Sequence, residues 1–345
     1  MEFFSHDLGI DLGTSNVLIY VDKKGVVVRE PSVVAVSKSN GRILQIGAAA
    51  HNMLGRTPGN VVAMQPLKDG VISDHEMTVK LLQTLFRSVS KASLFTPKPR
   101  VIITVPSGVT EVEERTVINA AIEAGARRVY LIEEPLAAAL GAGLDLRSNK
   151  GHMVVDIGGG TTNIAVLTLN SVAISSSLKV AGNAFDEAIA RDVRRKFGVA
   201  IGQVTAEDVK IQIGCVYPRE DVSMVVKGRD VKAGMPRELT LRSSDLYESM
   251  RRLGRQIADQ VLAVLDDTTP ELVADIAETG ITLTGGSSQI WGMDKLIMER
   301  TGISCRVADD PESCAAFGCG LSLAWINHMS EGPINIARKR ILNQL

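Results

Sequence analysis

One short pattern occurs twice in this sequence, and it constrains the fold more than any other feature. An apolar stretch ends in an aspartate, a glycine turn follows, and the chain returns as a second apolar stretch, first at residues 9–20 and again at 155–167. The two aspartates are Asp11 and Asp156, and the second copy lengthens the turn by two glycines. Each copy predicts a β-hairpin whose first strand ends at the aspartate.

Two further pairs of segments follow in the same order. Residues 101–108 resemble residues 280–287, each an apolar strand that enters a tight turn, and residues 134–144 resemble residues 310–321. Any single pair could arise by chance. Three pairs in one order indicate that the chain consists of two homologous halves that face each other.

The glycine turns suit the binding of a phosphate chain. Glycine tolerates positive φ, which lets successive backbone N–H groups point together at an anion. We therefore expect the turns to hold opposite sides of a polyphosphate, with hydroxyl groups as additional donors. The residues concerned are Gly13, Thr14 and Ser15 in the first turn, and Gly158, Gly159, Gly160, Thr161 and Thr162 in the second.

The aspartates of the two hairpins point to a metal ion. The carboxylates of Asp11 and Asp156 would repel phosphate, so we expect Mg²⁺ between them, because this cation needs only one or two carboxylates beside phosphate oxygens and water. The simpler interpretation of one hairpin is a turn that uses Asp and Gly only for its geometry. That interpretation does not account for two matching hairpins in opposite halves.

The rest of the sequence alternates between β-strand patterns and amphipathic helix patterns, which predicts an α/β fold. Predicted strands beyond the first hairpin include 32–36, 100–105, 129–132, 153–157, 163–169 and 280–283, and predicted helices are 77–89, 110–124, 184–196, 244–265 and 293–301. Thr110 is the predicted N-cap of its helix, since three glutamates whose charge suits a helix N-terminus follow it.

Composition and motifs exclude several classes of protein. A length of 345 residues is ample for two lobes, and a formal net charge of −1 gives no reason to expect nucleic acid as a partner. The four cysteines form no C-x-x-C pair, so we expect reduced thiols. No signal peptide, membrane-spanning apolar run or P-loop motif is present, which predicts a cytoplasmic protein outside the P-loop NTPases.

The order of phosphate loop, helix, phosphate loop, adenosine loop and helix resembles the superfamily of actin, DnaK-type chaperones and sugar kinases. Within it, essentially the whole chain is similar to the MreB family of bacterial actin-like cell-shape proteins. The resemblance lies in IDLGTSN at 10–16, EPSVVAV at 30–36, GRTPGN at 55–60, KDGVISD at 68–74, LIEEPLAAALGAGL at 131–144, VVDIGGGTT at 154–162, TAEDVKIQIG at 205–214, VKGRD at 226–230, PELVADI at 270–276 and LTGG at 283–286. EPSVVAV, GRTPGN and LIEEP are not general patterns of the superfamily, which makes the match specific.

The resemblance implies an actin-like fold, a duplicated ribonuclease H-like α/β architecture with a nucleotide cleft between two lobes. The first lobe would comprise residues 1–32, 73–147 and 318–345, with a small subdomain at 33–72. The second lobe would comprise residues 148–184 and 253–317, with a small subdomain at 185–252.

The family also implies ATP as the ligand and roles for single residues. Glu134 resembles the carboxylate that orients the attacking water, with Thr161 as its partner, which implies a weak ATPase that forms ADP and phosphate. Glu207 and Lys210 resemble a pair that contacts the nucleoside. The other positions that resemble nucleotide-binding residues are Asn16, Gly285, Gly286, Ser287 and Ser288. From the residues alone, Glu134 would be an acidic residue at a helix N-terminus, and Glu207 with Lys210 a surface ion pair.

The sequence departs from MreB-type chains in three places. Asn163 stands where those chains usually have glutamate, Ala181-Gly182-Asn183 stands where they have Gly-Gly-Asp, and Ser287 replaces a common third glycine. The first two changes remove carboxylates near the phosphates. We therefore predict that nucleotide binding is retained, while the hydrolysis rate and the metal dependence are the properties at risk.

The resemblance further implies head-to-tail filaments, whose contact does not close into a ring. Pairs of protofilaments in the family run antiparallel through the helix that begins here near Thr110, and Val112 stands at the contact position. From sequence alone, Val112 is an ordinary partly buried helix valine.

An apolar pair, Leu94 and Phe95, interrupts the polar segment 90–99. In the family an apolar loop at this place enters the membrane, which implies attachment to the inner face of the cell membrane. Phe3, Phe4 and the basic segment 338–340 are expected to contribute, and weak contacts add up along a filament. The implied function is to organise cell-wall synthesis and maintain rod shape, together with membrane proteins of the cell-elongation machinery.

One other function stays open, and another is excluded. A small-molecule kinase of the same superfamily would need a catalytic aspartate base and a substrate pocket, and no sugar-recognising group of residues is visible. A monomeric ATP-regulated chaperone would need a peptide-binding domain, for which 345 residues leave no room.

Overall fold

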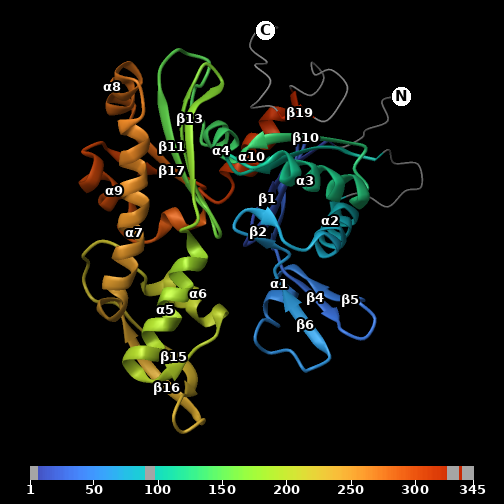
Figure 1. The fold of residues 1–345 in the computed structure, drawn as a ribbon, viewed down its shortest axis with the longest axis vertical. Helices are drawn as coiled ribbons and strands as arrows, with labels where there is room; N and C mark the ends of the chain where they lie inside the picture. The colour runs from blue at the N-terminus through green and yellow to red at the C-terminus, as the bar shows by residue number, and fades with distance from the viewer. Residues whose placement is uncertain (1–6, 90–97, 325–333, 336–345) are drawn as a thin grey trace.

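The first hairpin lies at the centre of a six-stranded sheet. β1 (Leu8–Leu12) pairs antiparallel with β2 (Asn16–Val21), which pairs with β3 (Gly25–Pro31). On its other side β1 runs parallel to β9 (Arg100–Val105), and the sheet continues with β10 (Arg128–Glu133) and β19 (Ile334–Asn335). The structure is a computed structural model that describes residues 7–89, 98–324 and 334–335 (Figure 1).

The second hairpin lies at the centre of a five-stranded sheet in the other lobe. β11 (His152–Ile157) pairs antiparallel with β12 (Thr162–Thr168), which pairs with β13 (Ser171–Leu178). On its other side β11 runs parallel to β17 (Ile281–Thr284) and then β18 (Cys305–Val307). The order β10-β9-β1-β2-β3 therefore has the same topology as β18-β17-β11-β12-β13, which confirms the internal duplication.

The central parallel strands are covered on both faces, which explains their continuous apolar sequences. In β9, Val101 and Ile103 face the core shared with helices α2 (His75–Val89) and α3 (Glu111–Ala124). Ile102 alternates to the opposite face, where it packs into a second core between the lobes. The predicted cap of α3 is confirmed, since the Glu113 N–H donates to Thr110 Oγ1 at 3.3 Å.

Two helices related by the internal repeat cross where the lobes meet. They are α4 (Glu134–Gly141) and α10 (Cys314–Ser322), which lie side by side at the centre of Figure 1. A Cβ on Gly141 would come within 1.8 Å of the Cys314 carbonyl oxygen, and one on Gly318 equally close to the Ala137 carbonyl oxygen. Only glycine permits this approach, so the crossing fixes how the two halves meet.

The second lobe carries most of the remaining helices. α5 (Gly182–Phe197), α6 (Gln203–Ile213) and α7 (Ser243–Asp266) pack together around its largest core. α8 (Pro270–Thr279) and α9 (Met293–Thr301) cover the sheet. No helix in the described part of the chain has the length and apolar character needed to cross a membrane. All four cysteines are free thiols.

Each lobe extends downward in Figure 1 into a small sheet. In the first lobe it consists of β4 (Val34–Ser37), β5 (Ile43–Ile46) and β6 (Val61–Met64), with α1 (Gly47–His51) beside it. In the second it consists of β14 (Val199–Ala200), β15 (Ser223–Asp230) and β16 (Pro236–Arg242). The short hairpin of β7 (Leu67–Lys68) and β8 (Val71–Ile72) leads back to the first lobe.

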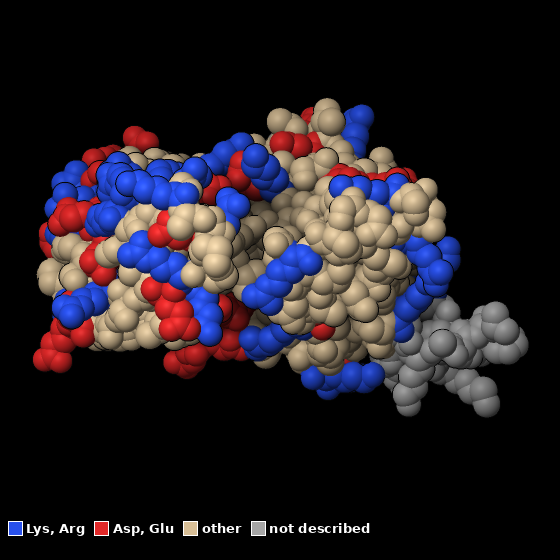
Figure 2. All heavy atoms as spheres, turned by 90° about the horizontal axis from the view of Figure 1, so that it is seen from below, with Lys and Arg blue, Asp and Glu red and all other residues tan. Residues whose placement is uncertain are grey.

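Seen from below, the ends of the two lobes that carry these small sheets are separated by a recess (Figure 2). The exact boundaries of the four subdomains stay predictions.

Candidate functional site

A cavity of about 410 Å³ lies between the lobes, and both glycine turns reach it. It also receives residues from α4, α6 and the loop that follows β17. The predicted site residues that line it are Asp11, Gly13, Thr14, Ser15, Asn16, Glu134, Asp156, Gly158, Gly159, Gly160, Thr161, Glu207, Lys210, Gly285, Gly286 and Ser287. Folding thus gathers into one place residues that come from both halves of the sequence.

The two glycine turns lie against each other across the cavity. A Cβ on Gly159 would come within 1.9 Å of Ser15 Oγ, and one on Gly160 within 2.5 Å of Thr14 Oγ1. Thr14 Oγ1 in turn accepts a hydrogen bond of 2.8 Å from the Gly70 N–H in the β7–β8 turn. A side chain at either glycine would push the turns apart, so the close approach of the hairpins depends on glycine at both positions.

Each hairpin aspartate is held by a threonine from the neighbouring parallel strand. Thr104 Oγ1 donates to Asp11 Oδ1 at 2.9 Å, and Thr284 Oγ1 donates to Asp156 Oδ1 at 2.6 Å. The two threonines occupy equivalent places in the duplicated sheets. This equivalence corrects the predicted alignment of residues 101–108 with 280–287 by one position, because that alignment placed Thr104 opposite Leu283.

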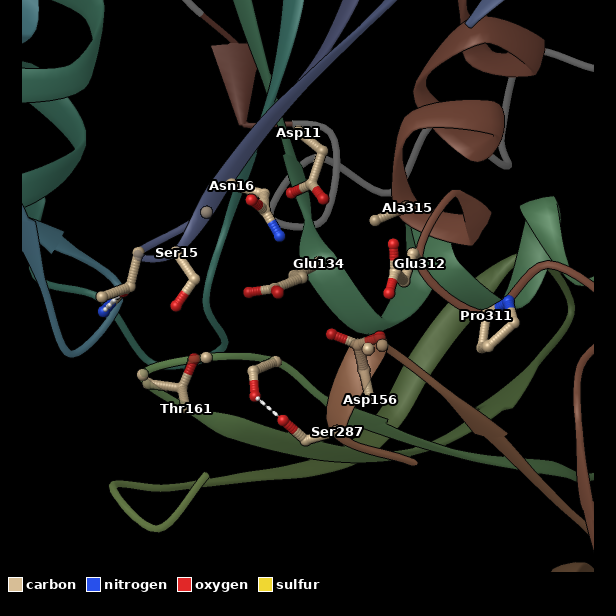
Figure 3. Close-up of a pocket in the computed structure, with 18 of the residues that line it drawn as sticks. Asp11, Ser15, Asn16, Glu134, Asp156, Thr161, Ser287, Pro311, Glu312 and Ala315 are labelled. Atoms are coloured by element: carbon tan, nitrogen blue, oxygen red, sulfur yellow. Dashed lines mark hydrogen bonds between the residues drawn. The ribbon is translucent and has the colours of Figure 1, made fainter. Parts of the chain in front are cut away.

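The carboxyl groups of Asp11, Glu134 and Asp156 form an enclosed acidic group (Figure 3). Burial raises the pKa of Asp11 to about 7, with the charge of Asp156 acting in the same direction. Burial also raises the pKa of Asp156, and it raises the pKa of Glu134 well above its usual value, to which the charges of Asp156 and Asp11 add. Without a counter-ion, this group therefore favours keeping protons.

Asp11 and Asp156, which face each other, could supply only some of the ligands of a magnesium ion. Their oxygens are the ligands that Mg²⁺ prefers, and a cation would favour their ionised forms. Within the described ranges, no group of three or more His, Cys, Asp or Glu side chains is placed to hold a metal ion. The arrangement therefore fits an ion that Asp11 and Asp156 would share with phosphate oxygens and water. Mg²⁺ stays a prediction.

Asn163 connects the two predicted catalytic residues. It is fully buried on β12, and its Nδ2 donates to Glu134 Oε2 at 2.9 Å and to Thr161 Oγ1 at 3.4 Å. Its Oδ1 has no hydrogen-bond partner among the described residues. The amide thus holds Glu134 and Thr161 together beside the cavity, on the side where the two turns meet.

Glu207 and Lys210 both line the cavity, but they do not form the surface ion pair that their spacing on a helix suggests. Lys210 is 8% exposed, and its Nζ lies 2.9 and 3.0 Å from the two carboxylate oxygens of Asp186 on α5. Burial raises the pKa of Asp186 to about 6, against the opposing charge of Lys210. Glu207 instead lies 3.2 Å from the Nε2 of His51, which belongs to the first lobe.

Two predicted binding residues do not reach the cavity with their side chains. The Thr162 hydroxyl donates to the Val180 carbonyl at 2.7 Å, and the Ser288 hydroxyl donates to the Gly285 carbonyl at 2.6 Å. At the outer surface, Val112 on α3 is 73% exposed rather than partly buried. Leu94 and Phe95 lie outside the described residues, as do Phe3, Phe4 and the basic segment 338–340.

Several residues that contribute to the site were not predicted from the sequence. Thr104 and Thr284 could have been found as hydroxyl residues at the ends of the strands that run beside β1 and β11. Asp186 and His51 carried no usable signal, because their partners Lys210 and Glu207 lie in distant segments. Other lining residues that were not predicted are Leu12, Leu18, Gly70, Pro106, Ile211, Gln289, Ile290, Pro311, Glu312 and Ala315.

Comparison with known proteins places the chain in a family. The family described as MreB/Mbl protein matches residues 5–331. The chain belongs to the MreB/Mbl family. The cell shape-determining protein MreB of Escherichia coli K12 is 47% identical, over 94% of this chain and 95% of that protein. Among MreB/Mbl relatives, the cell shape-determining protein Mbl of Bacillus subtilis is 44% identical, over 93% of this chain and 96% of its own length.

Solved structures confirm the actin-like fold of this MreB/Mbl chain. MreB 5 of Spiroplasma citri bound to AMPPNP superposes with a TM-score of 0.88 at 38% identity, covering 93% of this chain and 96% of that one. MamK, solved as a double helical filament, superposes with a TM-score of 0.77 at 23% identity, covering 92% and 98%. The MamK likeness supports the fold alone.

Proposed function

We propose that this chain is a cytoskeletal cell-shape protein that binds ATP between its lobes, hydrolyses it slowly and forms filaments. The observation that carries the nucleotide assignment is the meeting of the two glycine turns in one cavity, with Asp11 and Asp156 facing each other behind them. A relative with the same fold, MreB 5 of Spiroplasma citri, was solved with AMPPNP and with ADP. The same site in this chain suits a nucleoside triphosphate.

The side chains that line the cavity would have different roles in phosphoryl transfer. The turns would bind the phosphates through N–H groups and the hydroxyls of Thr14 and Ser15, and Mg²⁺ held by Asp11 and Asp156 would supply charge neutralisation. Glu134 would orient water toward the terminal phosphorus, whose bond to the bridging oxygen breaks as the new P–O bond forms. Asn163 and Thr161 would fix the direction of the Glu134 carboxylate.

Nucleotide binding and turnover are tested separately. We expect the purified chain to bind a fluorescent ATP analogue in excess Mg²⁺ and to release phosphate slowly. Asp11→Asn and Asp156→Asn variants should weaken the Mg²⁺-dependent part of binding. Failure of the wild-type chain to bind ATP or ADP in excess Mg²⁺ would refute the proposal.

Filament formation would couple this site to cell shape. ATP-dependent sedimentation followed by electron microscopy should reveal polymers, whereas a small-molecule kinase would stay in the supernatant. Val112 is 73% exposed near the start of α3, which suits a contact between antiparallel protofilaments. We expect Val112→Glu to yield single rather than paired protofilaments, and Ile122→Glu, on the same helix and 49% exposed, provides a comparison for the loss of an exposed apolar side chain.

Membrane attachment through Leu94 and Phe95 completes the proposal. Filaments on the inner face of the cell membrane would then organise cell-wall synthesis, together with membrane proteins of the elongation machinery. The test is co-sedimentation with anionic liposomes under assembly conditions. A Leu94→Ser, Phe95→Ser variant should polymerise but remain off the liposomes; liposome binding equal to wild type would contradict this role.

A further inference from the structure

A histidine–carboxylate contact joins the two lobes at the side of the nucleotide cavity. His51 Nε2 on α1 lies 3.2 Å from Glu207 Oε2 on α6, and both side chains are partly shielded from solvent, with 22% and 33% of their area exposed. Glu207 also lines the cavity between the lobes. One residue of this contact therefore belongs to the cavity wall, and the other belongs to the opposite lobe.

His51 is anchored to the first lobe. The Ala48 N–H at the start of α1 donates to Glu30 Oε2 at 2.8 Å, and Glu30 lies on β3 of the large sheet. The Gly47 N–H donates to the Val33 carbonyl at 3.0 Å. Because α1 has only five residues, these contacts leave His51 little freedom to move independently of the sheet.

Glu207 is anchored to the second lobe. Its helix α6 buries Ala206, Val209 and Ile213 in the main core of that lobe. Lys210, one turn further along α6, is held by Asp186 of α5. Any motion that opens the cavity by separating the small ends of the lobes must therefore break the contact between His51 and Glu207.

We propose that His51 is a positioning residue of the nucleotide site, which holds Glu207 in place and keeps the lobes closed over a bound nucleotide. The inference rests on the proposed function, since it assigns to His51 control of nucleotide release. A protonated imidazole forms an ion pair with Glu207, and a neutral imidazole that carries its proton on Nε2 still presents a donor to the carboxylate. The contact would hold the lobes together around a nucleotide that has already entered, so release is the step that it is proposed to slow.

The first measurement is the release rate of a fluorescent ATP analogue in Mg²⁺ after mixing with excess ATP, at a protein concentration below that needed for sedimentation. We expect His51→Ala to speed release roughly two- to fivefold, the range for a partly exposed ion pair. His51→Gln retains an N–H donor and should restore part of the slow release.

The chain provides a matched control. His75 on α2 lies 3.2 Å from Glu123 on α3, so it forms the same kind of contact at the same distance, but within the first lobe. His75→Ala should leave the release rate unchanged. Equal thermal midpoints of the two alanine variants would show that altered release in His51→Ala does not come from general destabilisation.

A double-mutant cycle separates positioning by His51 from a local structural effect. In a Glu207→Ala background, His51→Ala should cause no further acceleration, because the contact is already missing. Unchanged release in His51→Ala, equal acceleration in His75→Ala, or additive effects in the double variant would each overturn the inference. Absence of binding in the wild-type chain would overturn the proposed function as well, whereas normal binding with unaltered release overturns this inference alone.

Discussion

The side-chain amide of Asn163 donates a hydrogen bond of 2.9 Å to the carboxylate of Glu134. The same nitrogen approaches Thr161 Oγ1 at 3.4 Å, so one amide contacts both residues proposed to position the attacking water. MreB-type chains usually have glutamate at this position. A glutamate there would bring another negative charge toward Glu134, whereas the amide offers it a donor and stabilises its ionised form.

Replacing Asn163 by alanine should lower turnover without abolishing binding. Loss of a hydrogen bond to a charged group costs about 1.5–3 kcal/mol, so we expect phosphate release to slow by roughly tenfold or more, while nucleotide affinity changes much less. Single-turnover phosphate release and equilibrium titration measure the two quantities. Asn60→Ala, in the exposed turn before β6, serves as the control. Equal losses of affinity and turnover would count against a positioning role for Asn163.

The ligand-free chain should become less stable as the pH rises from 3.8 toward about 7. A carboxyl group whose pKa is raised by folding binds more protons in the folded than in the unfolded chain, so its contribution to stability is lost as the pH passes its folded pKa. The pKa of Asp11 rises from 3.8 to about 7. The stability of the Asp11→Asn chain should therefore depend less on pH in this range.

Chemical denaturation of the ligand-free wild-type and Asp11→Asn chains, at several pH values across this window, measures the effect. Asp186, whose pKa is raised to about 6, contributes in the same direction in both proteins and cancels in the comparison. If the free energy of unfolding falls with pH equally steeply in both chains, Asp11 does not carry the extra proton.

Lys210→Met should destabilise the chain strongly, since it leaves the buried carboxylate of Asp186 without its partner. Removal of one member of a buried ion pair typically costs about 3–5 kcal/mol. The loss should be smaller near pH 5, where Asp186 is protonated because its pKa is about 6. Urea denaturation measures both values.

An exposed ion pair provides the control for Lys210→Met. Lys227 is 81% exposed and pairs with Glu238 at 3.1 Å, so Lys227→Met should change stability little. A second variant, Lys210→Met with Asp186→Asn, should regain much of the lost stability. A Lys210→Met chain as stable as Lys227→Met would mean that the pair is not effectively buried.

Gly159→Ala should weaken nucleotide binding, because its Cβ would lie 1.9 Å from Ser15 Oγ and would push the two turns apart. Overpacking of this kind costs about 1–3 kcal/mol, which corresponds to roughly fivefold to 150-fold in affinity if the turns must meet in the complex. Gly59→Ala is the matched control, since nothing lies within 4 Å of the added Cβ. Titration with a fluorescent ATP analogue compares the two variants, and equal affinities would show that the turns need not meet.

Much of the architecture could be predicted because it depends on local pattern. The strands at 100–105 and 153–157 are apolar runs between turn signals, and the structure places strands there as β9 and β11. The predicted helix at 293–301 coincides with α9. The small sheet strands β15 and β16 were missed, because they form an exposed hairpin in which charged residues and Gly228 weaken the strand pattern.

The sequence by itself determined the duplication, the two glycine turns and the family, because each depends on a contiguous pattern of residues. Only the tertiary structure decided which side chains meet across the lobes: Asn163 with Glu134, Thr284 with Asp156, and His51 with Glu207. Glu207 and Lys210 show the difference clearly. Their spacing of three on one helix suggested that they pair with each other. In the folded chain, the buried Lys210 pairs with Asp186 instead, and Glu207 contacts His51 of the opposite lobe. Helical spacing fixes which residues share a face, whereas the choice of partner follows from which surfaces the folded chain brings together.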